Sequence, residues 1–474
     1  MYHLPILYDE ETDSQNQDDV VIDNNQRQTD ASLPSWSRRW MKLLPSLALF
    51  VLGGLVHQLF ASSPQPIPAV SNFTWTFQSI QPVLGRNLVE FGQFVPPEGN
   101  SFFPQVPSYN LPPLHRPRTP LFIPFTRNNA MMRQTVLGYI AAGWPRDDIV
   151  VVDNSGTMDA NNNRLLSEDN PFFLDYDLFL KRYGVSILQT PTLLNFAQLQ
   201  NFLLRTATNR DWPYYFWSHM DVGILSEEDV TPYMSLYHRV LQLMLDTGVG
   251  HNQDQGKWGM KLFQYDFLSL VNVDAWRQVG QWDVFVPYYG TDCDAYARLR
   301  MSGFSMDSVD VGTIWDVADH VLDPELEFFP PSSLINSTLG GFTGNTLDKR
   351  EKLTERQDEN GLNSTRFQAL RQTFQRFQDE KQKNSAGRNT WQNKQKGGKG
   401  EPWTYDPTGF QAAWWQTAEA GRQLYAKKWG TSNCNLIDEQ KKLSDMWKDA
   451  KEVTSRSIEG PLDGTSSYFG TLDV

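Results

Sequence analysis

The chain has 474 residues, of which 40% are hydrophobic and 13% aromatic, and this length suits one large domain with appendages or two domains. The formal net charge of −13 and the lack of a concentrated basic stretch argue against a nucleic-acid partner. Two cysteines, Cys293 and Cys434, allow at most one internal disulfide and exclude a scaffold held by many disulfides.

The N-terminal region predicts a membrane anchor behind a polar tail. Residues 1–38 are rich in Asn, Gln and Asp and have no apolar periodicity, so we expect a disordered tail. The largely apolar run Leu43–Phe60 has roughly the 18 residues that a spanning helix needs, and we predict a transmembrane helix over 39–60. A secretory signal peptide and a buried globular helix are the alternatives. The long polar stretch ahead of the run disfavours the signal peptide.

The residues around this run predict a single-pass type II topology. Basic residues flank its N-terminal side, so we expect the tail in the cytosol and the body in the lumen. The Asn-x-Ser/Thr acceptors all follow the run, at Asn72, Asn336 and Asn363. Residues 61–118 are rich in proline and predict an extended stem. This layout is typical of transferases of the Golgi or ER membrane.

A globular body is expected over 119–330, where strands alternate with helices. Aliphatic and aromatic runs that end in polar residues predict buried strands, and apolar residues at helical spacing predict the helices between them. Strand, helix and strand in succession form a βαβ unit, which implies a parallel sheet. The expected strands are Pro120–Asn129 with a polar loop at its end, Asp148–Asp153, Gly184–Leu188 and Trp212–His219, and the expected helices are Ala130–Ala142 and Thr192–Thr208.

The stretch Tyr214–Leu225 gives the clearest indication of a site. Its aromatic run is typical of a strand buried on both faces, and Ser218, His219 and Asp221 follow directly. Open α/β sheets bind ligands outside the carboxyl ends of their strands, so Asp221 is a candidate ligand-binding carboxylate. The alternative is a simple turn between two strands with a solvated Asp221.

Polar segments at two strand ends resemble motifs of a known family. Thr126-Arg127-Asn128 follows the first strand, and Asp153-Asn154-Ser155-Gly156-Thr157 follows the second. Together with the acidic segments further along, the stretch from about 120 to 320 resembles nucleotide-sugar glycosyltransferases of the GT-A fold and is similar to their family-2-type inverting enzymes. The resemblance implies a mostly parallel α/β sheet flanked by helices. It also implies that the donor nucleotide is contacted by Thr126, Arg127, Asp153, Asn154 and Ser155.

Two further segments resemble the metal-binding residues of that family. His219-Met220-Asp221 matches its Asp-x-Asp motif, with His219 in place of the first acid, and Asp319-His320 matches a histidine that often completes the metal shell. The resemblance implies that Asp221, His320 and His219 bind a divalent cation, which holds the donor diphosphate as a Lewis acid. Oxygen ligands suit Mg²⁺ or Mn²⁺, and an imidazole favours Mn²⁺. The alternatives are a capping or surface role for His320 and a turn role for His219.

The segment Gly290–Asp294 resembles the acidic block of the family, with Thr291 in place of its glutamate. Inversion at the anomeric carbon requires a carboxylate that removes the acceptor proton, and we assign Asp292 this role, with Asp294 as the second catalytic candidate. We expect a helix to begin at Asp292, where the helix dipole favours an ionised carboxylate. The alternative is that either acid only caps the helix. Cys293 is interpreted as a structural thiol or as the partner of Cys434.

Residues 331–474 are expected to form a helical extension with a polar loop that packs on the catalytic domain. The stretch Phe367–Gln382 has few apolar residues and is interpreted as a surface helix or a lumenal excursion. Gly409–Lys428 predicts an amphipathic helix. Its Trp414 and Trp415 are expected to pack on the core, with an acceptor platform as the alternative.

We therefore predict a membrane-anchored, inverting and metal-dependent glycosyltransferase of the secretory pathway. Its donor would be a nucleotide sugar, and its acceptor a glycan, glycoprotein or glycolipid. Two other classes stay open, because one fold hosts many functions: a nucleotidyltransferase on the same fold, and an inactive membrane-anchored protein that binds nucleotide sugars or carbohydrate. Release of a nucleoside diphosphate would distinguish the glycosyltransferase from both.

Overall fold

A computed structural model describes residues 94–99, 102–249, 257–330, 364–383, 395–401 and 407–448. The predicted tail, the predicted transmembrane helix and the three glycosylation acceptors lie outside these ranges. The same holds for Met1–Phe73, the first of the two compact units into which the chain divides. Within the described ranges, no helix combines the length and the apolar character needed to cross a membrane.

The body is built on an eight-stranded mixed sheet with the order β1-β4-β3-β2-β5-β8-β7-β9. Strands β4, β3, β2 and β5 run parallel to one another, β9 runs parallel to β7, and β8 is antiparallel to both of its neighbours. A second, two-stranded sheet pairs β10 antiparallel with β6. The strands are β1 (Phe94–Val95), β2 (Leu121–Phe125), β3 (Ile149–Asp153), β4 (Ser186–Gln189), β5 (Tyr214–Ser218), β6 (Val222–Ile224), β7 (Trp258–Phe263), β8 (Leu268–Asn272), β9 (Ser305–Val309) and β10 (Ile314–Asp316).

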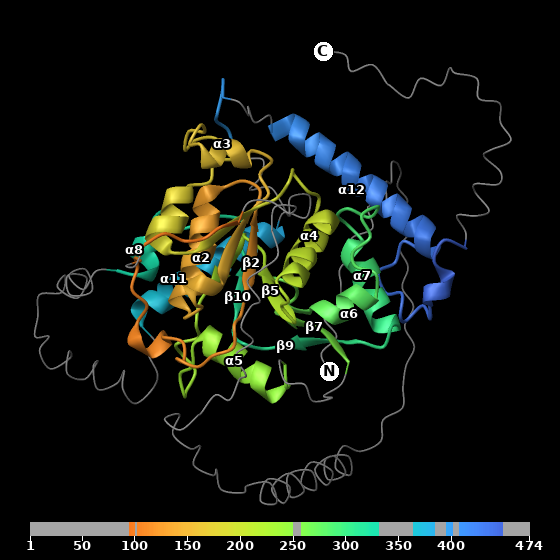
Figure 1. Ribbon diagram of the computed structural model, residues 1–474, viewed down its shortest axis with the longest axis horizontal. Helices are drawn as coiled ribbons and strands as arrows, with labels where there is room; N and C mark the ends of the chain where they lie inside the picture. The colour runs from red at the N-terminus through yellow and green to blue at the C-terminus, as the bar shows by residue number, and fades with distance from the viewer. Residues whose placement is uncertain are drawn as a thin grey trace, which may run out of the picture. The chain divides into compact units, whose positions relative to one another are not determined.

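Helices connect the strands and cover both faces of the main sheet (Figure 1). The α-helices are α2 (Asn129–Ala141), α3 (Met158–Asn162), α4 (Phe196–Asn209), α5 (Leu236–Asp246), α6 (Val273–Gln278), α7 (Thr291–Met301), α8 (Pro324–Phe328), α11 (Thr365–Lys383) and α12 (Pro407–Trp429). Short 3-10 turns are η3 (Ser108–Asn110), η4 (Arg146–Asp148) and η8 (Leu443–Asp445), and η5 (Leu178–Tyr183) is a π-helix.

The core has two layers, one on each face of the sheet. Successive side chains of a strand point to opposite faces, and in β2 this places Ile123 in the layer of α2, α5 and α11, and Phe122 in the layer of α4, α6 and α7. Figure 1 shows α2 and α11 on one side of β2 and β5, and α4 and α7 on the other. The central strands are therefore buried on both faces, as their continuous apolar runs predict.

The expected strand and helix order of the body is confirmed from β2 to β5, including the aromatic strand that ends at Ser218. Part of the expected stem differs, because the short strand β1 pairs antiparallel with β4 and so joins the edge of the sheet. The parallel strands β4, β3, β2 and β5 bring their carboxyl ends to one edge. The chain runs outwards from β2 to β4 and then returns to the other side of β2 at β5. This reversal between β2 and β5 is the point at which open α/β sheets bind ligands.

Most residues of α11 are exposed or half-buried, as a surface helix over Phe367–Gln382 predicts, but one face of the helix belongs to the core. Its buried residues Phe367, Leu370, Phe374 and Phe377 follow one another at intervals of three and four and form a single apolar face. The ring of Phe374 packs so closely on β6 that a Cβ on Gly223 would lie 2.6 Å from it. The four apolar residues are few but correctly spaced, and this spacing suffices to bury one face.

We predict that Phe374→Ala lowers the free energy of unfolding by about 3–5 kcal/mol, because it removes a fully buried ring that packs on Trp315 and Phe328 and leaves a cavity. Thermal and denaturant unfolding of the purified protein would measure the loss. Phe285→Ala is the control, since this side chain is 67% exposed. Equal stability of the two variants would show that α11 does not belong to the core.

Candidate functional site

The candidate site lies directly after β5, in the turn formed by His219, Met220 and Asp221. Hydrogen bonds from three sides hold the turn: the Thr135 hydroxyl donates to the Met220 carbonyl oxygen (2.5 Å), the His219 N–H donates to the Phe267 carbonyl oxygen (3.0 Å), and the Val317 N–H donates to the Asp221 carbonyl oxygen (2.9 Å). The turn is therefore fixed by α2, by the β7–β8 connection and by the residue after β10. Its side chains sit on a rigid support.

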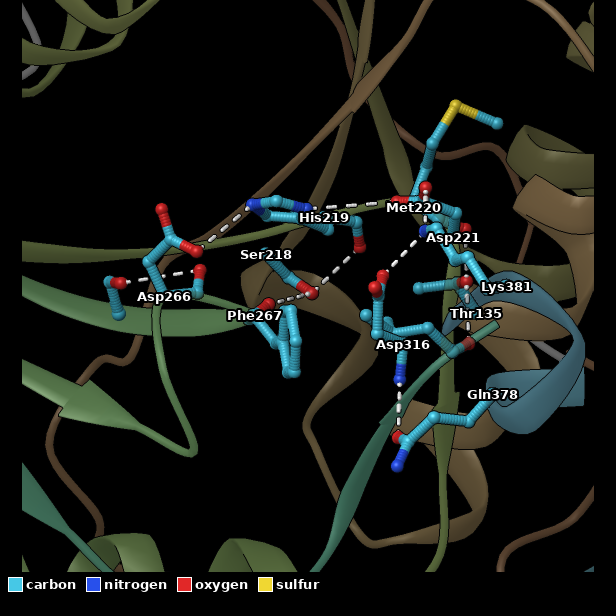
Figure 2. A network of polar contacts seen from close by, with 12 residues as sticks. Thr135, Ser218, His219, Met220, Asp221, Asp266, Phe267, Asp316, Gln378 and Lys381 are labelled. Carbon is cyan, nitrogen blue, oxygen red and sulfur yellow. Dashed lines mark hydrogen bonds and ion pairs between the residues drawn. The ribbon is translucent and has the colours of Figure 1, made fainter. Parts of the chain in front are cut away.

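The Asp221 carboxylate binds an ammonium group from another part of the chain. Lys381 Nζ, in the last turn of α11, lies 2.7 Å from Asp221 Oδ2 and 2.5 Å from Asp316 Oδ1 (Figure 2). The Lys381 side chain is 5% exposed, and both carboxylates are largely buried. The three groups form a buried ion cluster at the carboxyl end of β5, so the alternative of a solvated Asp221 in a simple turn is wrong.

The sequence places these three groups together through two separate pairings. Asp316 ends β10, which pairs with β6 so that Asp316 faces Val222, the residue after Asp221. Lys381 continues the apolar face of α11 one step beyond Phe377 at the same spacing, so the packing of α11 drives its side chain inward. Gln378 supports the arrangement, since its side-chain oxygen accepts the Asp316 N–H at 3.1 Å.

His219 extends the cluster to a third carboxylate. Its Nδ1 lies 3.7 Å from Asp221 Oδ1, and its Nε2 lies 3.5 Å from Asp266 Oδ1, as Figure 2 shows on the side away from Lys381. The imidazole also stacks on Trp217, with ring centroids 5.3 Å apart. Two ring nitrogens that both face carboxylates suit an imidazolium, in which both nitrogens carry protons.

Burial and charge together set the protonation of these groups. Burial opposes charge on Asp221, but Lys381 and His219 outweigh it and lower the pKa of the Asp221 carboxyl. Burial likewise opposes charge on Lys381 and His219, and the facing carboxylates outweigh it, so the pKa of each is raised. Burial raises the pKa of Asp266 to about 6 despite the nearby His219. Burial also raises the pKa of Asp316, despite the nearby Lys381. The shifts therefore favour the charged forms of Asp221, Lys381 and His219.

The expected divalent cation does not fit this arrangement. Asp221 and Asp316 both point at the Lys381 ammonium, which holds the position between them. His320 makes its contacts elsewhere: its Nδ1 lies 3.3 Å from Asp319 Oδ1, and burial lowers its pKa. The described residues contain no group of three or more His, Cys, Asp or Glu side chains placed to hold a metal ion. Metal binding by Asp221, His219 and His320 stays a prediction that the geometry does not favour.

The residues expected to contact the nucleotide follow β2 and β3 at the same edge of the sheet. The Asp153 side chain is fully buried and accepts hydrogen bonds from the Ser155 N–H (3.0 Å) and the Tyr176 hydroxyl (2.9 Å). Asn154 accepts the Leu194 N–H at 2.8 Å, and the Ser155 hydroxyl oxygen accepts the Thr157 N–H at 3.1 Å. These side chains shape the loop from within, so a nucleotide would meet the loop that they support.

Thr126 and Arg127 lie at the end of β2, between the ends of β3 and β5. Thr126 is half-buried. Arg127 is 3% exposed, and its guanidinium lies 4.3 Å from the centre of the Phe410 ring, near the start of α12. A cation over an aromatic ring fixes both groups. The C-terminal helix thus contributes to the surroundings of this edge.

Helix α7 brings Asp292 towards the cluster. Gly290, whose φ of +81° suits a residue without a Cβ, precedes the helix, and Asp292 lies in its first turn. The Tyr265 hydroxyl donates to Asp292 Oδ2 at 3.3 Å. Tyr265 adjoins Asp266, so the β7–β8 connection joins Asp292 to His219 and Asp221. Asp292 is half-buried, as a base that meets an acceptor must be.

Asp294 has a different environment from Asp292. It is fully buried, its Oδ2 accepts Arg298 Nε (2.9 Å), and its Oδ1 accepts both Trp429 Nε1 (2.9 Å) and Lys428 Nζ (2.6 Å). These partners belong to α7 and to the end of α12. The geometry gives Asp294 a structural role as the link between the two helices and leaves Asp292 as the candidate base.

A disulfide between Cys293 and Cys434 ties α7 to the segment after α12. It supports the same contact as Asp294, because Cys293 lies in α7 and Cys434 follows the last turn of α12. The two cysteines are the only ones in the sequence, so the chain holds no free thiol. The C-terminal segment is therefore fixed to the body of the protein by a covalent bond as well as by ion pairs.

The chain matches no family model and no curated protein. Among solved structures, it is similar to a mannosyltransferase from Pyrobaculum calidifontis in complex with GDP-Man and Mn²⁺, with 12% identity, a TM-score of 0.28, and coverage of 60% of this chain and 91% of that one. It is also similar to a cytidylyltransferase from Leptospira borgpetersenii (14%, TM-score 0.25, 53% and 99%). A third is glucosyl-3-phosphoglycerate synthase from Mycobacterium tuberculosis in complex with Mn²⁺, UDP and phosphoglyceric acid (12%, TM-score 0.24, 48% and 83%).

Structural similarity at such low TM-scores gives no evidence of function. The function has to be inferred from the residues of this chain. The sheet is mixed and mostly parallel between β4 and β5, helices cover both of its faces, and polar side chains gather where the strand order reverses. This architecture fits a GT-A-like α/β fold.

We predict that Asp294→Asn lowers the free energy of unfolding by about 3–5 kcal/mol, because it removes the charge that two buried cations face. Thermal unfolding beside Asp274→Asn, an exposed acid in the first turn of α6, measures the difference. A normal melting temperature with lost ligand binding would instead place Asp294 in the site.

The raised pKa of Asp266 predicts a pH-dependent effect on stability. Its folded pKa of about 6 exceeds the usual 3.8, so the folded state holds this proton more tightly than the unfolded state. The stabilisation of the folded state by this proton is fully present below about pH 4 and is lost as pH rises through about 6. The free energy of unfolding therefore falls by on the order of 3 kcal/mol over this range. Asp266→Asn should therefore be more stable than the parent protein at pH 7.5, and the gain should shrink towards pH 4.5. A gain that does not change with pH, measured by denaturant unfolding, would contradict the assignment.

Proposed function

We propose that the protein is a glycosyltransferase that moves a sugar from a nucleotide-sugar donor to an acceptor hydroxyl, with inversion. The observation that carries the proposal is the convergence of one ionised cluster and one half-buried carboxylate at the reversal between β2 and β5. Asp221, Asp316, Lys381 and His219 form the cluster, and Asp292 reaches it through Tyr265 and Asp266. In the sequence resemblance, the segment around Asp221 binds the donor diphosphate and Asp292 is the base.

Each residue has a role that its position allows. The donor diphosphate would lie outside the carboxyl end of β5, where the cations of the cluster neutralise the charge that develops on the leaving group. The nucleotide would lie over the ends of β2 and β3, beside Thr126 and Arg127 and on the loop that Asp153 supports. Asp292 would remove the proton of the acceptor hydroxyl as that oxygen attacks the anomeric carbon.

We further propose that the body is lumenal and that a transmembrane helix over 39–60 anchors it in the Golgi or ER membrane. The Cys293–Cys434 disulfide supports this location, because disulfides persist in oxidising compartments. The acceptor would then be a glycan, a glycoprotein or a glycolipid. Glycosidase treatment of the protein made in a eukaryotic host tests the topology: a lower apparent mass is expected, and a body digested by protease in intact microsomes would contradict it.

A panel of UDP- and GDP-sugars tests the reaction. We expect release of nucleoside diphosphate from one donor, transfer of the sugar to an acceptor, and a product with the opposite anomeric configuration by NMR. Asp292→Asn should lower the turnover number by about 10²–10⁴-fold with donor affinity and melting temperature nearly unchanged, because a base acts only in the transition state. The matched control is Asp274→Asn, which alters an exposed acid in the first turn of a neighbouring helix.

Three outcomes would overturn the proposal. Release of pyrophosphate would show nucleotidyl transfer instead. Binding of donors without turnover would show an inactive binding protein. A full turnover number in Asp292→Asn, with a melting temperature several degrees lower, would make Asp292 a helix cap and place the base elsewhere.

A further inference from the structure

The buried ion cluster raises the question of why a lysine sits between two carboxylates at the end of the central strand. Lys381 is the fourth residue after Phe377 and lies on the same face of α11. An apolar residue at this position would continue the apolar face. Buried ion pairs stabilise a fold poorly, because desolvation of the charges offsets their attraction, and apolar replacements are often as stable. Stability alone is therefore a weak reason for this lysine.

The Lys381 ammonium has one donor that neither Asp221 nor Asp316 uses. Two of the three N–H donors of its ammonium are directed at Asp221 and Asp316, at 2.7 and 2.5 Å. Within the described part of the chain, Lys381 Nζ has hydrogen bonds to these two carboxylates only. The ammonium lies beside the turn after β5, at the edge of the sheet where the parallel strands end. Phe374 on Gly223 and Gln378 on Asp316 fix the helix that carries it.

Two side chains supply the positive charge of the cluster. A divalent cation would bring two positive charges to these carboxylates. The Lys381 ammonium lies between Asp221 and Asp316, and the two ring nitrogens of His219 face Asp221 and Asp266. Two single positive charges on fixed side chains thus place among three carboxylates the same positive charge that one divalent ion would bring.

We infer that Lys381, assisted by His219, takes the place of the divalent cation and binds the donor diphosphate, so that transfer needs no metal. This inference rests on the proposed function. In the reaction the acceptor oxygen forms a bond to the anomeric carbon, and the bond from that carbon to the diphosphate oxygen breaks. The bonding electron pair leaves with the nucleoside diphosphate, whose charge the ammonium stabilises, and the acceptor proton goes to Asp292.

The first test compares chelator with metal in the parent protein. Nucleoside diphosphate release should be the same within about twofold in EDTA and in Mn²⁺, and the affinity for UDP or GDP measured by calorimetry should be equally insensitive. A turnover or affinity that EDTA lowers by tenfold or more would overturn the inference. If no donor is turned over, the proposed function fails, whereas the binding measurement still decides whether Lys381 or a metal holds the diphosphate.

The second test changes Lys381. Lys381→Ala should lower turnover and nucleoside diphosphate affinity in EDTA by at least about tenfold, and Mn²⁺ should restore part of both, because the variant leaves Asp221 and Asp316 without their cation. Lys381→Arg should retain more of the affinity in EDTA, since it keeps the charge. The matched control is Lys261→Met, which removes a buried lysine from an ion pair with Asp307 between β7 and β9.

A purely structural role for Lys381 has a different signature. In that case Lys381→Ala and Lys261→Met would lower the melting temperature alike, and the affinity of both variants for UDP or GDP in EDTA would equal that of the parent protein. If Lys381→Ala does not fold, the comparison uses Lys381→Arg, which keeps the positive charge, and Lys381→Gln, which removes the charge but keeps a polar side chain. Equal affinity of these two variants in EDTA would also overturn the inference.

Discussion

Two buried carboxylates next to each other require a cation, and this requirement shapes the centre of the molecule. The pairing of β6 with β10 sets Asp221 beside Asp316, and neither carboxylate could stay ionised there without a positive partner. Lys381 meets the requirement only if α11 docks on β6 and β10. The docking depends on Phe374, which needs a glycine at position 223. The geometry of the site therefore depends on the packing of α11 against β6 and β10.

Much of the fold could be predicted from local sequence. The strands from β2 to β5 are continuous apolar runs that end in polar residues, and parallel sheets bury such strands on both faces. Asp221 could be placed because it directly follows one of these runs. Helix α11 was harder, since only four of its residues are apolar, but their spacing of three and four was sufficient evidence of a buried face. The same spacing predicts that Lys381 lies on the buried face of α11, although a search for apolar residues does not find it.

The rest of the site could not be predicted, because it depends on contacts between distant segments. Asp266 and Asp316 reach His219 and Asp221 through strand pairings that the sequence does not reveal. Motif spacing also cannot distinguish a carboxylate that binds a ligand from one that holds a loop. Asp153 and Asp294 match the motifs, yet both are fully buried and engaged by protein donors. Asp292, two residues from Asp294, is half-buried and faces the cluster side.

The Lys381 ammonium is proposed to take the place of a metal ion at the donor diphosphate. The most direct measurement is a crystal structure with the nucleoside diphosphate released from the donor, grown in Mn²⁺ and recorded with anomalous scattering. We predict a diphosphate oxygen within hydrogen-bond distance of Lys381 Nζ and no manganese peak between Asp221 and Asp316. A manganese peak bridging Asp221 and the diphosphate, with the Lys381 side chain displaced, would contradict the claim.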